Sequence, residues 1–221
     1  MFPASPLRTV LNVGSGPANP LKLHAAFRRE GWREVRLDID PAVNPDILGS
    51  TADMRGFLAD GSVDAVWSSH NIEHLAAHEV PGALAEMVRV LKDGGFALIT
   101  CPDVEAVAAM IVEKGLDAIA YQSPAGPVTP LDMLWGHGAS VAAGHAHMAH
   151  RTGFTVQRLA RLALAAGFAE VRLAKGVLDL WALCLKPGCD PAALAPLFEN
   201  TAQASLLAAG PEEAEDPGPP A

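Results

Sequence analysis

The sequence predicts an α/β fold, in which a mostly parallel sheet carries helices on both faces. Short β-prone runs alternate with helix-like segments through the first hundred residues, and this alternation is typical of such sheets. Residues 96–101 are apolar except for Thr100, as expected of a central parallel strand that is buried on both sides. Half of the 221 residues are hydrophobic, so one domain with a sizeable core can form.

The predicted strands are short runs of β-prone residues that end at turn residues. They cover residues 8–13, 34–37, 46–48, 63–67, 96–101, 170–174 and 180–185. The gap between the second and the third run is too short for a helix, so we expect a loop in place of that crossover. The last two runs are separated by a short turn and should form an antiparallel pair.

The predicted helices follow from apolar residues that recur every three or four positions. They cover residues 21–29, 78–91, 104–114 and 155–166. The second is the clearest, because Val80, Leu84 and Met87 share one face. Gly167 and Phe168 have the form of a glycine C-cap with a hydrophobic clasp, which ends the last helix.

One domain is expected to span residues 1–186. Within it, residues 103–153 are irregular and rich in proline and histidine, and a long segment of this kind often covers a substrate site. Residues 187–221 read as a tail rich in proline, alanine and glutamate, weakly helical at first and disordered from about residue 210.

Composition excludes several classes of protein. The net charge is −9, which argues against general nucleic-acid binding, because that needs clustered cations. No apolar stretch is long enough for a transmembrane helix, so no membrane insertion is expected, and the N-terminus lacks the pattern of a signal peptide. Three cysteines without CxxC spacing (Cys101, Cys184 and Cys189) indicate neither a disulfide framework nor a zinc site, and favour a reducing cytoplasm.

The residues that follow the first two strands indicate a nucleoside-containing ligand. Gly14 and Gly16 allow a tight turn and a close approach of the backbone to a ligand. Asp38 ends the second strand, where a carboxylate can accept hydrogen bonds from both ribose hydroxyls. A turn or capping role is the alternative for Asp38, and Asp40 competes for the ribose. Asn19 stands where the dinucleotide pattern GxGxxG has its third glycine, which counts against an NAD-dependent oxidoreductase.

Taken in order, several sequence blocks resemble the class I S-adenosylmethionine-dependent methyltransferases of the type 11 kind. The block of residues 89–95, Arg-Val-Leu-Lys-Asp-Gly-Gly, is the most specific of them. The resemblance covers residues 8–102 well and continues loosely through the last helix and the final strand pair. The other blocks are residues 10–16, 37–41, 63–70 and 73–75.

This resemblance implies a Rossmann-like class I methyltransferase fold, with a seven-stranded type of sheet that ends in an antiparallel pair. It also implies an enzyme that transfers a methyl group from S-adenosylmethionine to a small-molecule or sugar acceptor. The cofactor-binding residues that it implies are Asn12, Gly14, Ser15, Gly16, Asp38, Ile39, Asp53, Met54, Ser69 and His70. Among these, Asp53 would hold the adenine amino group, and Ser69 and His70 would line the sulfonium side.

Two residues depart from the usual pattern of this family. Asn12 stands where an acidic residue is usual, although its amide can still form hydrogen bonds, and Ala18 replaces the third loop glycine. These departures keep a non-catalytic S-adenosylmethionine-binding protein open as an alternative.

The nearest candidates for a general base are His70, Glu73 and His74, although the last two could instead cap the following helix. No metal site is predicted. The histidines of the irregular segment (His137, His145, His147 and His150) do not share the face of any one regular element, and a polar lid suits them better. The sequence identifies neither the acceptor, nor the methylated atom, nor the oligomeric state.

Overall fold

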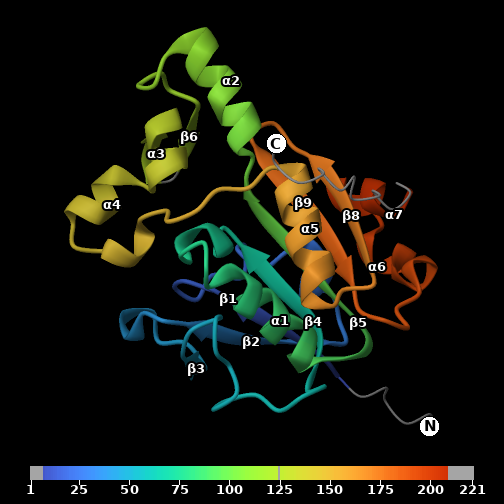
Figure 1. The fold of residues 1–221 in the computed structure, drawn as a ribbon. Helices are drawn as coiled ribbons and strands as arrows, with labels where there is room; N and C mark the ends of the chain where they lie inside the picture. The colour runs from blue at the N-terminus through green and yellow to red at the C-terminus, as the bar shows by residue number, and fades with distance from the viewer. Residues whose placement is uncertain (1–6, 124, 209–221) are drawn as a thin grey trace, which may run out of the picture.

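The computed structural model describes residues 7–123 and 125–208, and its main sheet has seven strands in the order β3-β2-β1-β4-β5-β9-β8 (Figure 1). The strands are β1 (Arg8–Val13), β2 (Trp32–Asp38), β3 (Ile47–Leu48), β4 (Val63–Ser69), β5 (Leu91–Pro102), β8 (Glu170–Lys175) and β9 (Asp179–Leu185). The first five are parallel, whereas β9 runs antiparallel to both of its neighbours. The predicted Rossmann-like α/β fold and its antiparallel final pair are therefore confirmed.

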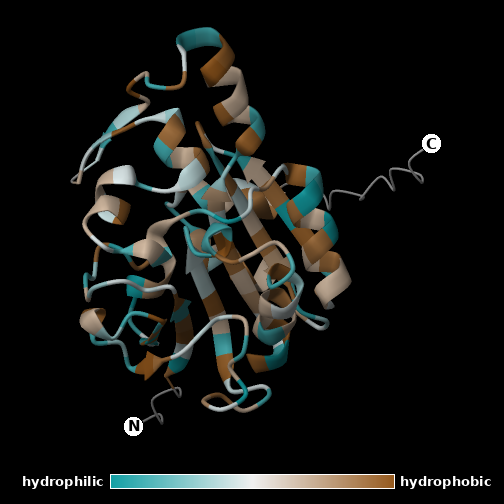
Figure 2. Ribbon diagram, turned by 60° about the vertical axis from the view of Figure 1, so that its left-hand side comes forward, coloured by the Kyte–Doolittle hydropathy of each residue, from teal (hydrophilic) through white to brown (hydrophobic). Residues whose placement is uncertain are grey.

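One face of the sheet is covered by α1 (Val80–Val90) and α5 (Val156–Ala166). Leu84 of α1 and Leu159 of α5 are fully buried in one core cluster with strand residues such as Ile99. Hydrophobic colour runs along the central strands, whereas the helices carry both hydrophobic and hydrophilic segments (Figure 2). Gly167 ends α5 in a left-handed conformation with φ of 110°, as the predicted C-cap requires.

The opposite face is covered by short helices from both ends of the chain. These are η1 (Ala25–Arg28), η5 (Pro191–Leu194), α6 (Ala195–Phe198), η6 (Ala202–Ala204) and α7 (Ser205–Ala208). Phe198 and Leu206 are fully buried in a second core cluster with Leu98 of β5. Packed structure thus continues past residue 186, where the predicted tail begins, to residue 208. The disorder predicted from about residue 210 falls on residues 209–221, which lie outside the described residues.

The predicted helix over residues 21–29 is wrong, because only the single 3₁₀ turn η1 forms there. Two side chains compete with a continuous helix for backbone N–H groups. Asn19 Oδ1 accepts a hydrogen bond from the backbone N of Leu21 at 2.9 Å, and His24 Nδ1 accepts one from Ala26 at 3.2 Å. The loop predicted between the second and third strands is present and contains only η2 (Pro41–Val43).

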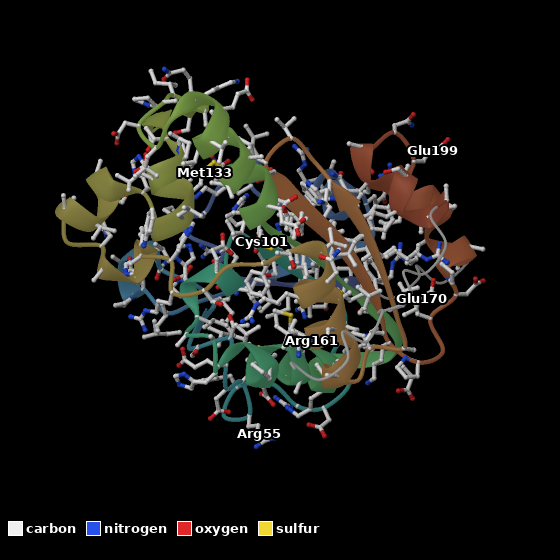
Figure 3. All side chains as sticks on the ribbon, turned by 45° about the horizontal axis from the view of Figure 1, so that its top comes forward. Arg55, Cys101, Met133, Arg161, Glu170 and Glu199 are labelled. Carbon is white, nitrogen blue, oxygen red and sulfur yellow. The ribbon has the colours of Figure 1, made fainter. Side chains whose placement is uncertain are left out.

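The irregular segment is a layer of its own beyond the carboxyl ends of the strands. It contains α2 (Val104–Lys114), β6 (Tyr121–Ser123), β7 (Gly126–Val128), α3 (Pro130–Trp135), α4 (Gly138–Ala142) and η4 (Ala146–Met148). Asp103 and Phe154 form a β-bridge that closes the base of this layer, close to the predicted limits of residues 103 and 153. Met133 of α3 packs in a small third cluster, at a distance from the sheet residue Cys101 (Figure 3).

Cys101 and Cys184 are buried, and all three cysteines are free thiols. Burial raises the pKa of Cys184 to about 12, so this thiol is a packing residue rather than a nucleophile. Among the described helices, none has the length and apolar character needed to cross a membrane.

Candidate active site

A cavity of about 830 Å³ lies at the carboxyl ends of β1, β2 and β4. Ligands of parallel α/β sheets bind at this edge. The loops after these strands contribute the glycine loop, Asp38 and His70, while His147 and Arg151 reach the cavity from the irregular layer. The cavity therefore lies between the sheet and the segment that the sequence predicts as a cover.

The loop after β1 needs glycine at two positions. Gly14 and Gly16 have φ values of 63° and 61°, which side chains resist. A Cβ atom on Gly14 would stand 2.4 Å from Oδ1 of Asn71, so the backbone passes directly against that side chain. The loop presents backbone rather than side chains to the cavity at these points.

Asp38 fixes this loop to the end of β2. Its Oδ2 accepts a hydrogen bond from the backbone N of Gly16 at 2.7 Å, and its Oδ1 accepts one from Asp40 at 2.9 Å. Asp38 lines the cavity and is 8% exposed. The carboxylate is therefore held rigidly, with oxygen lone pairs still available to a ligand hydroxyl.

Asn12 lies deeper in the cavity wall and is 4% exposed. Its Nδ2 donates a hydrogen bond to Oε1 of Glu34 at 2.7 Å. The amide of Asn12 is thus oriented by a carboxylate from the neighbouring strand β2.

Two of the predicted cofactor-binding residues are not brought to the cavity. Asp53 is exposed and its Oδ1 accepts a hydrogen bond from the backbone of Arg55, while Met54 is fully buried in the core. A turn that joins the backbone N of Asp53 to the carbonyl of Ser50 directs the chain away from the cavity. Ser50 and Thr51 line the cavity in their place, and the other predicted cofactor-binding residues, Ile39 and Ser69 included, also line it.

The three predicted base candidates take different positions around η3 (Ile72–His74). His70 lines the cavity in a left-handed conformation with φ of 48°. Its Nδ1 lies 3.2 Å from Oε1 of Glu73, and its Nε2 lies 3.9 Å from Oδ1 of Asp179. Burial lowers the pKa of His70, but the hydrogen bond that its ring donates to Glu73 and the charges of Glu73 and Asp179 outweigh burial, so the net shift is upward.

Glu73 is 1% exposed and does not line this cavity. It lines instead a second cavity of about 310 Å³ beneath α3, together with Trp135 and His150. His74 does line the first cavity. Arg151 lines both cavities, so they are neighbours.

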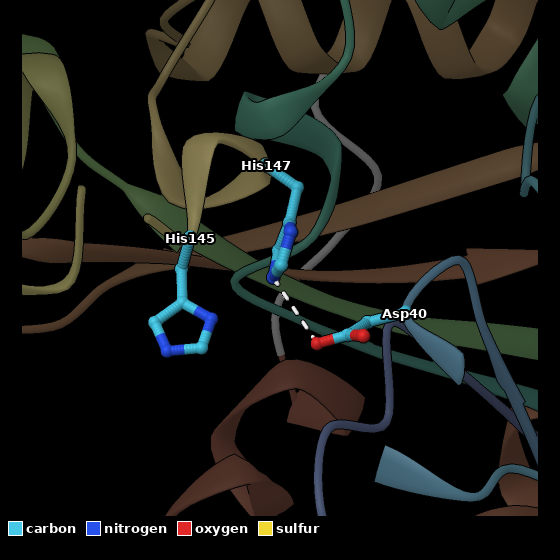
Figure 4. Close-up of side chains that lie close together, drawn as sticks. All are labelled: Asp40, His145 and His147. Atoms are coloured by element: carbon cyan, nitrogen blue, oxygen red, sulfur yellow. Dashed lines mark ion pairs between the residues drawn. The ribbon is translucent and has the colours of Figure 1, made fainter. Parts of the chain in front are cut away.

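The histidines of the irregular layer divide into separate groups. His147 Nε2 lies 3.6 Å from Oδ2 of Asp40, and His145 stands beside it (Figure 4). His150 packs edge-on against His74, with ring centroids 4.7 Å apart, and burial lowers its pKa. His137 hydrogen-bonds Ser140 at 2.8 Å.

The cavity residues that sequence reasoning missed include three polar ones from irregular segments: Lys22, Asn71 and Arg151. Lys22 Nζ lies 3.1 Å from the place where a Cβ on Gly16 would stand, so its ammonium group sits over the glycine loop. Lys22 was missed because the sequence analysis placed it in a predicted helix over residues 21–29, and not in a loop at the edge of the sheet. No signal in the sequence marks Asn71 or Arg151.

The model of a methyltransferase domain family matches residues 11–99, which contain β1 to β5 in large part and the loops after β1, β2 and β4. A search of curated proteins gives no match.

Solved structures share the fold at low sequence identity. A SAM-dependent methyltransferase from Archaeoglobus fulgidus is 14% identical, with a TM-score of 0.54 over 81% of this chain and 86% of that one. A protein from Pyrococcus horikoshii is 14% identical, with a TM-score of 0.55 over 81% and 82% of the two chains. Phosphoethanolamine N-methyltransferase 2 from Haemonchus contortus, solved in complex with S-adenosyl-L-methionine, is 11% identical, with a TM-score of 0.53 over 84% and 50%.

The strand order is Rossmann-like, and the part of the chain that carries the loops after β1, β2 and β4 matches a methyltransferase domain. The solved structures share this fold, which is that of class I S-adenosylmethionine-dependent methyltransferases.

Proposed function

We propose that this protein is an S-adenosylmethionine-dependent methyltransferase and that it methylates a small-molecule or sugar acceptor, which binds in the 830 Å³ cavity beneath the layer of residues 103–153. The observation that carries the proposal is that one cavity is lined both by the glycine loop with Asp38 and by polar residues of that layer. Its volume lies in the upper part of the range of small-molecule sites, about 300–1,000 Å³, and so leaves room for a cofactor and a small acceptor together.

The residues present fit S-adenosylmethionine. Gly14 and Gly16 let a ligand approach the backbone closely. A side chain on Gly14 would clash with Asn71, and one on Gly16 would crowd the ammonium group of Lys22. We assign the ribose hydroxyls to Asp38, and the methionine part to Asn12 and the glycine loop. Lys22 over that loop supplies a cation for a carboxylate. Ser69, Ile39 and the turn of Ser50 and Thr51 complete the proposed wall, so Asp53 and Met54 have no proposed contact with the cofactor.

When bound, the cofactor supplies a methyl group on a sulfonium, which is open to in-line attack by a nucleophile. The protein's part is mainly orientation, and well-placed reactants gain ~7–11 kcal/mol. Of the three base candidates, the geometry favours His70 as the residue that contacts the acceptor, because its ring faces the cavity and Glu73 holds the ring from behind.

The polar inner side of the cover supports the proposed acceptor class. Ser140, His145, His147 and Arg151 reach the cavity from that side, and such groups suit an acceptor that is rich in hydroxyl groups. The net charge of −9 argues against a nucleic-acid acceptor. Three free cysteines support a reducing cytoplasmic location.

The ribose assignment is tested by titration calorimetry with S-adenosylhomocysteine on Asp38→Asn and Asp38→Ala. Hydrogen bonds to a charged group contribute ~1.5–3 kcal/mol, so we expect both variants to bind about 10- to 100-fold more weakly. Asp53→Ala is the matched control, because this exposed aspartate should leave the affinity unchanged. Normal binding by the Asp38 variants, or weak binding by Asp53→Ala, would overturn the assignment.

The acceptor class is tested by measuring S-adenosylhomocysteine release with a panel of sugars and small hydroxylated molecules. Turnover with a member of the panel, and its loss in His70→Ala, would support the proposal. Turnover only with a protein or nucleic-acid acceptor would overturn it.

A further inference from the structure

A compact group of possible metal ligands lies between the two cavities, outside the cofactor-binding residues. Glu73, His74 and His150 each offer one ligand atom, and these atoms all lie within 4.8 Å of one another. Glu73 and His74 belong to η3, directly after β4, whereas His150 lies where the irregular layer returns to the sheet. Two parts of the chain that are distant in sequence thus converge on one point.

The carboxylate of Glu73 has a free oxygen in a buried place. Its Oε1 is engaged with His70 Nδ1 at 3.2 Å, but its Oε2 is buried and has no hydrogen-bond partner. Burial of an uncompensated carboxylate oxygen is costly, and buried charges are normally paired or bound to a metal. A cation or a hydrogen-bond donor next to Oε2 would compensate its burial, and no described side chain donates a hydrogen bond to it.

The two histidines are oriented as metal-binding histidines usually are. His74 Nδ1 donates to the carbonyl oxygen of Ala149 at 3.2 Å, and His150 Nδ1 donates to that of Met133 at 2.8 Å. A carbonyl can only accept, so these bonds place the proton of each neutral ring on Nδ1 and leave Nε2 as a lone pair. Outer-shell bonds of this kind fix the tautomer of metal-ligating histidines.

We propose that Glu73, His74 and His150 form a binding site for a divalent transition-metal ion, with zinc as the best-suited metal. Two imidazoles and one carboxylate are a common zinc ligand set. A bound ion would join η3 to the return of the irregular layer, and would thereby pin the cover beside the cofactor cavity. On this proposal Glu73 and His74 are ligands rather than bases.

A second group supplies a matched comparison. Asp40, His145 and His147 also offer ligand atoms within 4.8 Å of one another. However, both histidines are exposed, and Asp40 already uses Oδ1 to cap η2 and Oδ2 to face His147. This group therefore lacks the buried free oxygen that marks the first.

The test is metal binding by the full chain after treatment with a chelator. We expect calorimetry to show one equivalent of Zn²⁺, and Co²⁺ to give visible d–d absorption bands. His150→Ala, and separately His74→Ala, should weaken the affinity by more than about 100-fold, because even outer-shell changes cost about 10- to 100-fold. The double variant His145→Ala/His147→Ala should bind as the wild type does.

Absence of stoichiometric binding by the wild-type chain would overturn the proposal, as would loss of binding only in the His145/His147 variant. Thermal unfolding of each variant in metal-free buffer shows whether it folds, and Glu73→Gln gives a further removal of a ligand with little change of shape. S-adenosylhomocysteine affinity is measured in parallel, so that failure of the metal site and failure of the cofactor site are distinguishable.

Discussion

Gly14 illustrates how a single residue shapes the cofactor site. Its left-handed backbone and the contact with Asn71 leave no room for a side chain. Asp38 shows the complementary case, because its carboxylate is useful only where both oxygens are fixed by neighbouring backbone N–H groups. The loop and the carboxylate therefore act together, and either one alone would be a weak indication of function.

We predict that Gly14→Ala weakens S-adenosylhomocysteine binding by at least about 10-fold, since left-handed backbone costs a side chain ~1–3 kcal/mol and Asn71 must also move. Gly31→Ala is the matched control. Gly31 has a similar positive φ of 88°, but a Cβ there would meet nothing within 4 Å. Titration calorimetry should show normal affinity for Gly31→Ala, and equal affinities of the two variants would contradict the contact argument.

At the scale of elements, α1 is tied to the loop before β4 by a buried ion pair. Arg89 Nε donates to Oε1 of Glu86 at 2.7 Å, and Glu86 Oε2 accepts a hydrogen bond from the backbone N of Met54 at 2.7 Å. Arg89 also donates to the carbonyl oxygen of Leu58 at 2.8 Å. The hydrogen bond from Arg89 lowers the pKa of Glu86 and outweighs burial, which raises it. This pair explains why Met54 is directed to the core.

We predict that Glu86→Gln lowers the free energy of unfolding at neutral pH by ~1–3 kcal/mol, because the buried partners of Glu86 lose a charged acceptor. The folded-state pKa of Glu86 is below its ordinary value of 4.5, so its contribution is fully present above that pH. It is lost as the pH falls through the folded-state pKa.

Urea unfolding at several pH values measures this difference. The gap between wild type and Glu86→Gln should shrink below about pH 4.5. Glu113→Gln, a change to an exposed acid on α2, should leave stability unaltered at every pH. A gap that is constant across the acid range would refute the role of the charge.

At the scale of the whole molecule, a hydrophobic core lies on each face of the sheet, and the two cores are formed with helices from different parts of the chain. One core packs α1 and α5, whereas the other depends on residues 190–208 at the C-terminal side of the chain. The irregular layer adds a small cluster of its own and lies over the cofactor cavity. The segment after β9 is therefore part of the fold rather than an appendage to it.

We predict that Phe198→Ala lowers the free energy of unfolding by ~3–5 kcal/mol, which is the usual effect of removing a buried aromatic ring. Val177→Ala is the control, because Val177 is 91% exposed. Urea unfolding followed by tryptophan fluorescence compares the two. A stable Phe198→Ala variant would show that residues 190–208 contribute little to the core.

The sequence by itself determined the seven strands of the main sheet, the helices α1, α2 and α5, the glycine loop and the position of Asp38. These features follow from local patterns and from the rule that the carboxyl ends of parallel strands meet at one edge. Only the tertiary structure decided the rest. A turn directs Asp53 away from the cavity. The hydrogen bond from the backbone of Leu21 to Asn19 prevents the helix predicted to contain Lys22. The ring of His74 packs against that of His150, which is distant in sequence. Such contacts depend on how distant segments pack, and no local spacing of residues records that packing.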